Sequence, residues 1–127
     1  MFRLMLVIGA GAAIGAWGRW GLSEWLNPMH SIIPLGTLCA NVFGGLCVGL
    51  ALGWLNQHPE WGPEWRLFIV TGMLGAFTTF STFSSEVVHM LEQQNYGWAF
   101  GTTLLHLIGS LSMTVLGLAI SRWASSA

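Results

Sequence analysis

The stretch "TGMLGAFTTFSTFSSE", Thr71 to Glu86, decides how this sequence folds. It lies in one of the most apolar parts of the chain, yet it is rich in hydroxyl side chains and is interrupted by glycines and phenylalanines. A polar group at bilayer depth is costly unless it faces the protein interior, a partner or water. We therefore expect this segment to be a membrane span that faces little lipid.

The composition of the whole chain supports a membrane protein. Of its 127 residues, 54% are hydrophobic and 7% are charged, against about 25% charged in soluble domains. Since a spanning helix needs about 20 apolar residues, the sequence predicts an all-α protein with a single four-helix transmembrane domain over residues 1–127. The expected spans are roughly residues 4–26, 35–55, 65–92 and 97–123. A net charge of −1 without a basic cluster argues against a nucleic-acid partner.

Glycines recur at helical spacing in the first two spans. Gly11 and Gly15 form a GxxxG pair, and Gly45, Gly49 and Gly53 repeat every four residues. Such spacing lets a neighbouring helix approach closely. We expect these stripes to be helix contacts.

Glycines followed by threonines predict an interruption of the third span between Leu74 and Thr79. The residues concerned, Gly72, Gly75, Thr78 and Thr79, belong to types that lower helix propensity. Backbone carbonyls freed at mid-membrane need partners, and in transporters such breaks coordinate Na⁺. A mild kink, patched by the threonine hydroxyls, is an equally good interpretation of the spacing.

The fourth span carries a polar track, since His106, Ser110 and Thr114 share one helix face. Each hydroxyl taken alone could bond back to a carbonyl of its own helix. Together with Asn41 in the second span, the track favours a functional path. No nucleophile and base stand at a recognisable motif, and no series of carboxylates and histidines forms a proton relay, so the sequence does not predict an enzyme.

The arginines give only a weak preference for one orientation. Arg3, Arg66 and Arg122 are expected on the side of the termini, and Arg19 towards the other. The chain is therefore expected to insert in both directions. Two opposite copies would then pair about a two-fold axis in the membrane plane, as inverted repeats do in transporters.

Three segments carry a family resemblance: "GRW" (18–20), "GTLCANVFGG" (36–45) and the opening stretch. With them the chain closely resembles the fluoride channel family called Fluc or CrcB, over essentially its whole length. The resemblance implies a passive channel in the bacterial inner membrane that exports cytoplasmic fluoride and so reduces its toxicity. It also implies an antiparallel, dual-topology homodimer with broken third helices and two pores. A central structural Na⁺ would be held by the backbone carbonyls of Gly75 and Thr78 from both subunits.

The same resemblance implies a set of pore residues. Fluoride is small and tightly hydrated, so a narrow pore must replace its water with hydrogen-bond donors, and a phenylalanine ring adds its positive edge. Arg19 would stand in the vestibule. The implied lining residues are Asn41, Phe80, Phe83, Ser110 and Thr114, with Thr37, Ser81, Thr82 and His106 as further candidates.

Two other functions are weighed against the channel. A small proton-coupled exporter would share the dual topology but normally needs a membrane-embedded carboxylate in the first helix, and Glu24 lies too near its end. A non-transporting membrane assembly subunit would need only the glycine stripe of the second span, and the polar track would then have no use.

Overall fold

The structure, a computed structural model, describes residues 1–126 and is built from helices. Four helical regions are long and apolar enough to cross a membrane, as the sequence predicts. Each extends a few residues beyond the predicted span: Phe2–Met29, Leu35–Gln57, Pro59–Glu92 and Tyr96–Ser126.

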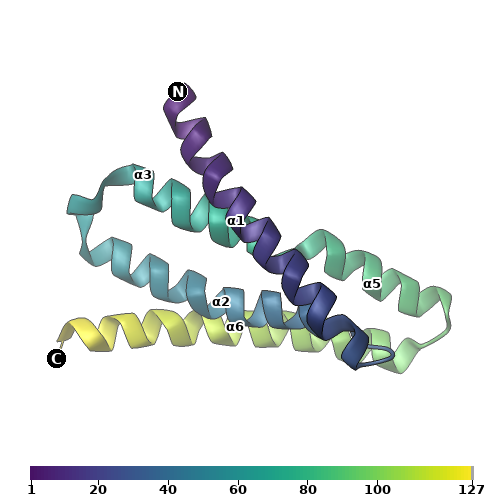
Figure 1. The fold of residues 1–127 in the computed structure, drawn as a ribbon. Coiled ribbons are helices and arrows are strands. Elements are labelled where there is room, and N and C mark those ends of the chain that lie inside the picture. Colours follow the sequence, from purple (N-terminus) through teal and green to yellow (C-terminus); the bar gives the residue numbers. More distant parts are fainter. Residues whose placement is uncertain (127) are drawn as a thin grey trace.

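The first, second and fourth regions are each dominated by one long helix. These are α1 (Phe2–Leu26), α2 (Leu35–Gln57) and α6 (Tyr96–Ser126). Helices α2 and α6 lie side by side and run in the same direction, while α1 crosses the third region (Figure 1). The short turn η1 (Asn27–Met29) leads towards α2, and the Asn27 side chain accepts a hydrogen bond from the Gly36 N–H at 2.7 Å.

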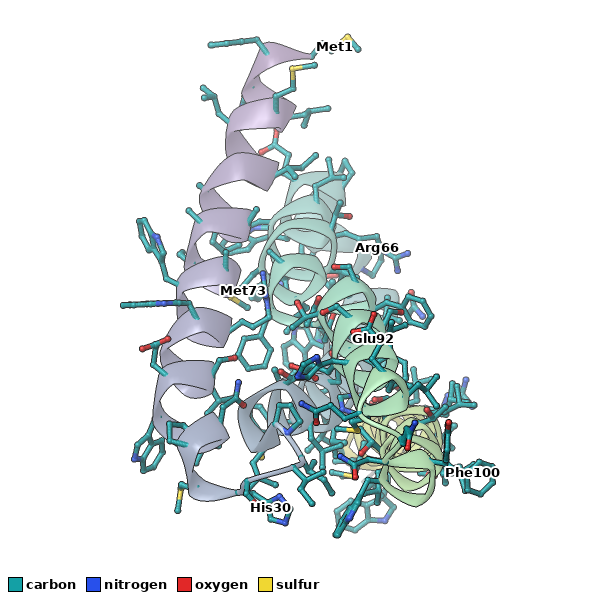
Figure 2. The ribbon with its side chains drawn as sticks, turned by 90° about the vertical axis from the view of Figure 1, so that its right-hand side faces the viewer. Met1, His30, Arg66, Met73, Glu92 and Phe100 are labelled. Atoms are coloured by element: carbon teal, nitrogen blue, oxygen red, sulfur yellow. The ribbon has the colours of Figure 1, made fainter. Side chains whose placement is uncertain are left out.

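Glycines hold the long helices together at backbone distance, which confirms the expectation from their spacing. We call the contact of Gly45, Gly49 and Gly53 on α2 with α6, which includes Gly117, the glycine interface. A methyl group on Gly49 would collide with the Thr114 carbonyl, and one on Gly117 with the Leu46 carbonyl. On the other side of the molecule, Gly15 of α1 meets the backbone of Met73, the residue that Figure 2 labels beside this helix.

The third region is a succession of segments. After η2 (Pro59–Trp61) come α3 (Gly62–Arg66), the wider π-helical η3 (Leu67–Leu74), α4 (Gly75–Phe77) and α5 (Phe80–Glu92). Between α4 and α5 the backbone is extended at Thr78 (φ −80°, ψ 155°) and Thr79 (φ −152°, ψ 118°). We call these two residues the helix junction. Gly72 and Gly75, in contrast, are helical.

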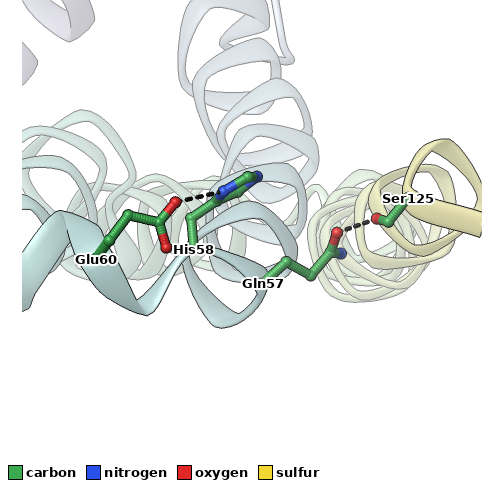
Figure 3. Close-up of polar contacts among 4 residues, drawn as sticks. All are labelled: Gln57, His58, Glu60 and Ser125. Atoms are coloured by element: carbon green, nitrogen blue, oxygen red, sulfur yellow. Dashed lines mark hydrogen bonds and ion pairs between the residues drawn. The ribbon is translucent and has the colours of Figure 1, made fainter.

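One polar contact joins the C-terminal ends of α2 and α6, and a second lies in the turn just after α2. The Ser125 hydroxyl donates to the Gln57 side chain, and the His58 ring lies 2.8 Å from the Glu60 carboxylate (Figure 3). Elsewhere the surface is strongly apolar, and Figure 2 shows the first turns of α1, near Met1, standing clear of the other helices. Large apolar side chains exposed on all sides are expected where lipid or another subunit covers a helix bundle.

Candidate functional site

Helices α2, α5 and α6 border an open groove of about 500 Å³ at the helix junction. The sequence places its polar lining on three segments that are far apart in the chain, and the fold brings them together because the glycine interface sets α2 directly against α6. The predicted site residues that line the groove are Asn41, Thr78, Phe80, Phe83, His106, Ser110 and Thr114.

Asn41 is the centre of the hydrogen bonding in this groove and is only 9% exposed. Its amide nitrogen donates to the Thr79 carbonyl at 2.9 Å, and its amide oxygen accepts from the Thr79 N–H at 2.7 Å. The same amide nitrogen lies 3.0 Å from Nδ1 of His106. Asn41 thus satisfies both backbone groups of Thr79, which no helical bond satisfies within this membrane-depth segment.

His106 presents an unused donor. Because an amide N–H faces Nδ1, that nitrogen must accept, and the ring proton of the neutral imidazole is on Nε2. Within residues 1–126 the buried Nε2 has no hydrogen-bond partner. Its ring stacks on Phe83 with the centroids 4.4 Å apart. A buried donor without an acceptor is rare in proteins and calls for a ligand or a water.

Two phenylalanines form the adjoining wall. Phe80 and Phe83 meet edge to face, with centroids 5.6 Å apart and ring planes at 66°. Phe80 is 78% exposed, so most of its ring has no cover within this chain. The edge of an aromatic ring is its positive part, which makes such a wall compatible with an anion.

The two hydroxyls of the polar track, on Ser110 and Thr114, differ in their hydrogen bonding. Thr114 donates back to the Ser110 carbonyl at 2.9 Å and also lies 3.0 Å from the Gly45 carbonyl. For Thr114, back-bonding to its own helix is therefore observed. Ser110 contributes its carbonyl to that bond, and its side chain remains on the groove.

Five predicted site residues lie outside the groove lining: Gly75, described below, and Thr37, Ser81, Thr82 and Arg19. Thr37, 1% exposed, donates to Glu86 at 2.5 Å, and the second oxygen of Glu86 has no partner within residues 1–126. Ser81 and Thr82 stand at the start of α5 beside the hydroxyl of Thr79. Arg19 donates through Nε to the Ala76 carbonyl at 3.1 Å, which ties α1 to the last turn of α4.

Thr79 is a site residue that sequence reasoning did not single out. Its backbone pairs with Asn41, and its hydroxyl accepts from the Thr82 N–H at 3.1 Å and so caps α5. The signal was present, since threonine is a preferred residue immediately before a helix. Thr103 also lines the groove and was not named as a site residue.

The oxygens available to a cation are backbone carbonyls near the helix junction. Thr78 donates through both its N–H and its hydroxyl to the Leu74 carbonyl, at 3.0 and 2.9 Å. The Thr78 carbonyl itself accepts no hydrogen bond within the described residues. Gly75 is exposed on the surface one turn earlier. Unpartnered carbonyls are the hard oxygen ligands that alkali and alkaline-earth cations take.

Comparison with known proteins identifies the family. The family described as "CrcB-like protein, Camphor Resistance (CrcB)" matches residues 6–118 of this chain. The chain belongs to this CrcB-like family.

Curated relatives of this CrcB-like chain cover nearly its whole length. A protein of Paracidovorax citrulli (strain AAC00-1) is 51% identical over 123 residues, which are 97% of each chain. A protein of Pseudomonas putida (strain W619) is 49% identical over 94% of each chain. One of Thiobacillus denitrificans (strain ATCC 25259 / T1) is 54% identical over 88% of this chain and 90% of its own. Each of the three carries the name "Fluoride-specific ion channel FluC".

Proposed function

We propose that this CrcB-like protein is a fluoride-selective, passive ion channel that lets cytoplasmic fluoride leave the cell. The observation that carries the proposal is the unpartnered Nε2–H of His106 beside the Phe80 and Phe83 rings in one groove. The names of the curated relatives support the choice of fluoride as the anion.

The chemistry of the groove suits a small, dehydrated anion. A permeating fluoride exchanges its water for donors on the wall. The groove offers the Ser110 hydroxyl and phenylalanine ring edges, and the unpartnered His106 N–H is buried in the same wall. The lining residues within the described chain carry no charged side chain. Conduction requires that the anion bind weakly enough to be released. Neutral donors meet this requirement, since they attract an anion without the full charge that would trap it.

The channel is proposed to be an antiparallel homodimer with dual topology. Phe80 is 78% exposed, and the groove is open on one side, so a second copy would complete its wall. The weak arginine bias of the sequence is compatible with opposite insertion of two copies. Two copies give two equivalent grooves, and therefore two pores.

A structural Na⁺ at the dimer centre belongs to the same proposal. The residues that would hold it are Gly75 and Thr78 of both subunits, in a third span that is broken at the helix junction. The unpartnered Thr78 carbonyl and the exposed Gly75 fit such a ligand set. When bound, the ion would offset the negative partial charge of these carbonyl oxygens.

The physiological role follows from the chemistry of the anion. Hydrogen fluoride is a weak acid that crosses a membrane uncharged and dissociates in the more alkaline cytoplasm. The trapped anion then needs its own exit, and a potential that is negative inside drives it outwards. A multi-pass protein in the bacterial inner membrane would in this way reduce fluoride toxicity.

Flux from liposomes tests the function. Vesicles with the purified protein are loaded with potassium fluoride or potassium chloride, and valinomycin is added to let K⁺ follow the anion. We expect rapid fluoride efflux at a fluoride electrode, negligible chloride efflux, and neither from protein-free vesicles. Absence of fluoride efflux, or equal efflux of chloride, would contradict the proposal.

A further inference from the structure

The helix junction leaves backbone groups that no helix satisfies, and some of them find side-chain partners. Where one helix ends and another begins, carbonyls and N–H groups lose their intrahelical bonds. Arg19 donates to the Ala76 carbonyl, and the Asn41 amide donates to the Thr79 carbonyl and accepts from the Thr79 N–H. The Thr78 carbonyl stays without a partner within residues 1–126.

The direction of that free carbonyl depends on Asn41. The Thr78 carbonyl and the Thr79 N–H belong to one planar peptide unit, which is trans. In a trans peptide the C=O and the N–H point in opposite directions. Because the Thr79 N–H points at the Asn41 amide oxygen at 2.7 Å, the Thr78 carbonyl must point away from Asn41.

We propose that Asn41 is a positioning residue for the cation site, in addition to any contact it makes with the permeating anion. By holding the Thr79 peptide groups on the groove side, it turns the Thr78 carbonyl towards the opposite side. The inference rests on the proposed function, since it takes Na⁺ as the ligand of Thr78 and Gly75. The side chain is 9% exposed and has both its oxygen and its nitrogen engaged, as a fixed support requires.

The same amide reaches into the anion groove. Its nitrogen lies 3.0 Å from His106 Nδ1, and this contact is what leaves the ring proton on the unpartnered Nε2. One side chain therefore orients a carbonyl for a cation and an N–H for an anion. Loss of the Asn41 side chain is expected to weaken the binding of both ions, although this side chain would make no contact with the cation.

A cation titration of thermal stability separates positioning from simple structural support. Without the Asn41 amide, the helix junction samples other conformations. The apparent affinity for Na⁺ then falls in proportion to the fraction of molecules in the conformation that can bind Na⁺. A purely structural role would instead lower the melting temperature equally at every Na⁺ concentration. The melting temperature of the purified dimer is therefore measured against NaCl, with N-methyl-D-glucamine chloride keeping the ionic strength constant.

The variants are chosen to isolate the junction. Asn41→Ser removes both contacts with Thr79. The Na⁺ midpoint, which is the NaCl concentration that gives half of the rise in melting temperature, should then increase about tenfold, the effect of losing one to two net hydrogen bonds. Asn41→Leu keeps a similar side-chain volume but also removes both contacts with Thr79, so its midpoint should rise in the same way; it carries the test if the serine variant does not fold. Ala99→Gly, at a 2% exposed position on α6, should lower the melting temperature without moving the midpoint.

The outcomes distinguish the inference from the proposed function. A wild-type protein that is indifferent to Na⁺ contradicts the sodium assignment and the role of Asn41 with it. A wild-type protein that is stabilised by Na⁺, with the same midpoint in the folded Asn41 variant, overturns the positioning role alone. A raised midpoint in the Asn41 variant and an unchanged one in Ala99→Gly support it.

Discussion

Helix α2 takes part in two contacts of opposite kinds, one between backbones and one made by a polar side chain. At the glycine interface, Gly45 and Gly49 bring its backbone against α6, with no room for a single methyl group. At the helix junction, Asn41 extends a side chain to backbone groups that have lost their helical partners. The first contact depends on the absence of side chains, and the second on the hydrogen-bonding geometry of one of them.

The two contacts should therefore fail in different ways. Added volume at Gly45, Gly49 or Gly117 has nowhere to go, because the nearest atom that it would collide with is a backbone carbonyl oxygen. A change near the helix junction removes hydrogen bonds or ring edges and leaves the helices in place. Stability should be most sensitive at the glycine interface, and ion flux most sensitive at the groove.

The largest effect is expected for Gly117→Ala. Its new methyl group would meet the Leu46 carbonyl and the Leu50 nitrogen, and we expect a loss of at least about 3 kcal/mol in unfolding free energy. Gly101→Ala in the same helix is the matched control, since nothing lies within 4 Å of the added carbon, and it should be neutral or slightly stabilising. Thermal unfolding in detergent measures both. Equal melting temperatures would mean that the interface is not closely packed.

Phe83→Ile should change flux rather than folding. The substitution removes the ring that stacks on His106, and we expect fluoride flux to fall at least about tenfold, equivalent to about 1.4 kcal/mol. Phe80→Ile should act in the same direction. Phe68→Ile is the control, because Phe68 packs edge to face on Trp65 and lies outside the groove lining. If flux from liposomes stays unchanged in both groove variants, the two rings serve packing only.

Thr79→Ala should cost about 1 kcal/mol, because α5 loses the hydroxyl that accepts the Thr82 N–H. Thr79→Ser keeps that oxygen and should restore the stability. As a comparison, Thr103→Ala removes a hydroxyl that bonds back to the Ala99 carbonyl of its own helix, and little change is expected. Amide hydrogen exchange at Thr82 reports the capping bond directly. Slow exchange in the alanine variant would argue against the cap.

The smallest effect is expected for Arg3→Ala. Arg3 and Glu64 form an ion pair at 2.8 Å, but their side chains are 79% and 38% exposed. Such pairs contribute below about 0.5 kcal/mol and are weakened by salt. A double-mutant cycle with Glu64→Gln, measured at low and high potassium chloride, gives the coupling energy. A large coupling that persists at high salt would show that the pair is shielded from water.

The sequence predicted the elements whose signal is local. Apolar runs identified the four spans, and the spacing of Gly45, Gly49 and Gly53 identified a helix contact face, because both signals depend only on helical periodicity. The i, i+4 spacing likewise grouped His106 with Ser110 on the groove side of α6.

What the sequence did not reveal depends on the register between distant segments. Asn41 and Thr79 are 38 residues apart, and Arg19 and Ala76 are 57 apart, so neither pairing has a local signature. Within the predicted interruption, Leu74 to Thr79, the backbone becomes extended only at Thr78 and Thr79, and Gly75 remains helical. Gly72 remains helical because it packs against the backbone of α1, and such tertiary contact outweighs its low helix propensity, a deficit of about 1 kcal/mol.

The glycine interface joins α2 to α6, two helices that are far apart in the sequence, and this constrains the order of assembly during synthesis. Gly45 and Gly49 are synthesised long before residues 96–126, so the backbone surface at these glycines has no packing partner until α6 has been made. Contacts between distant segments form late. The groove therefore acquires its His106 wall only after α6 has been made, and a chain that stops before α6 can have neither the interface nor the groove.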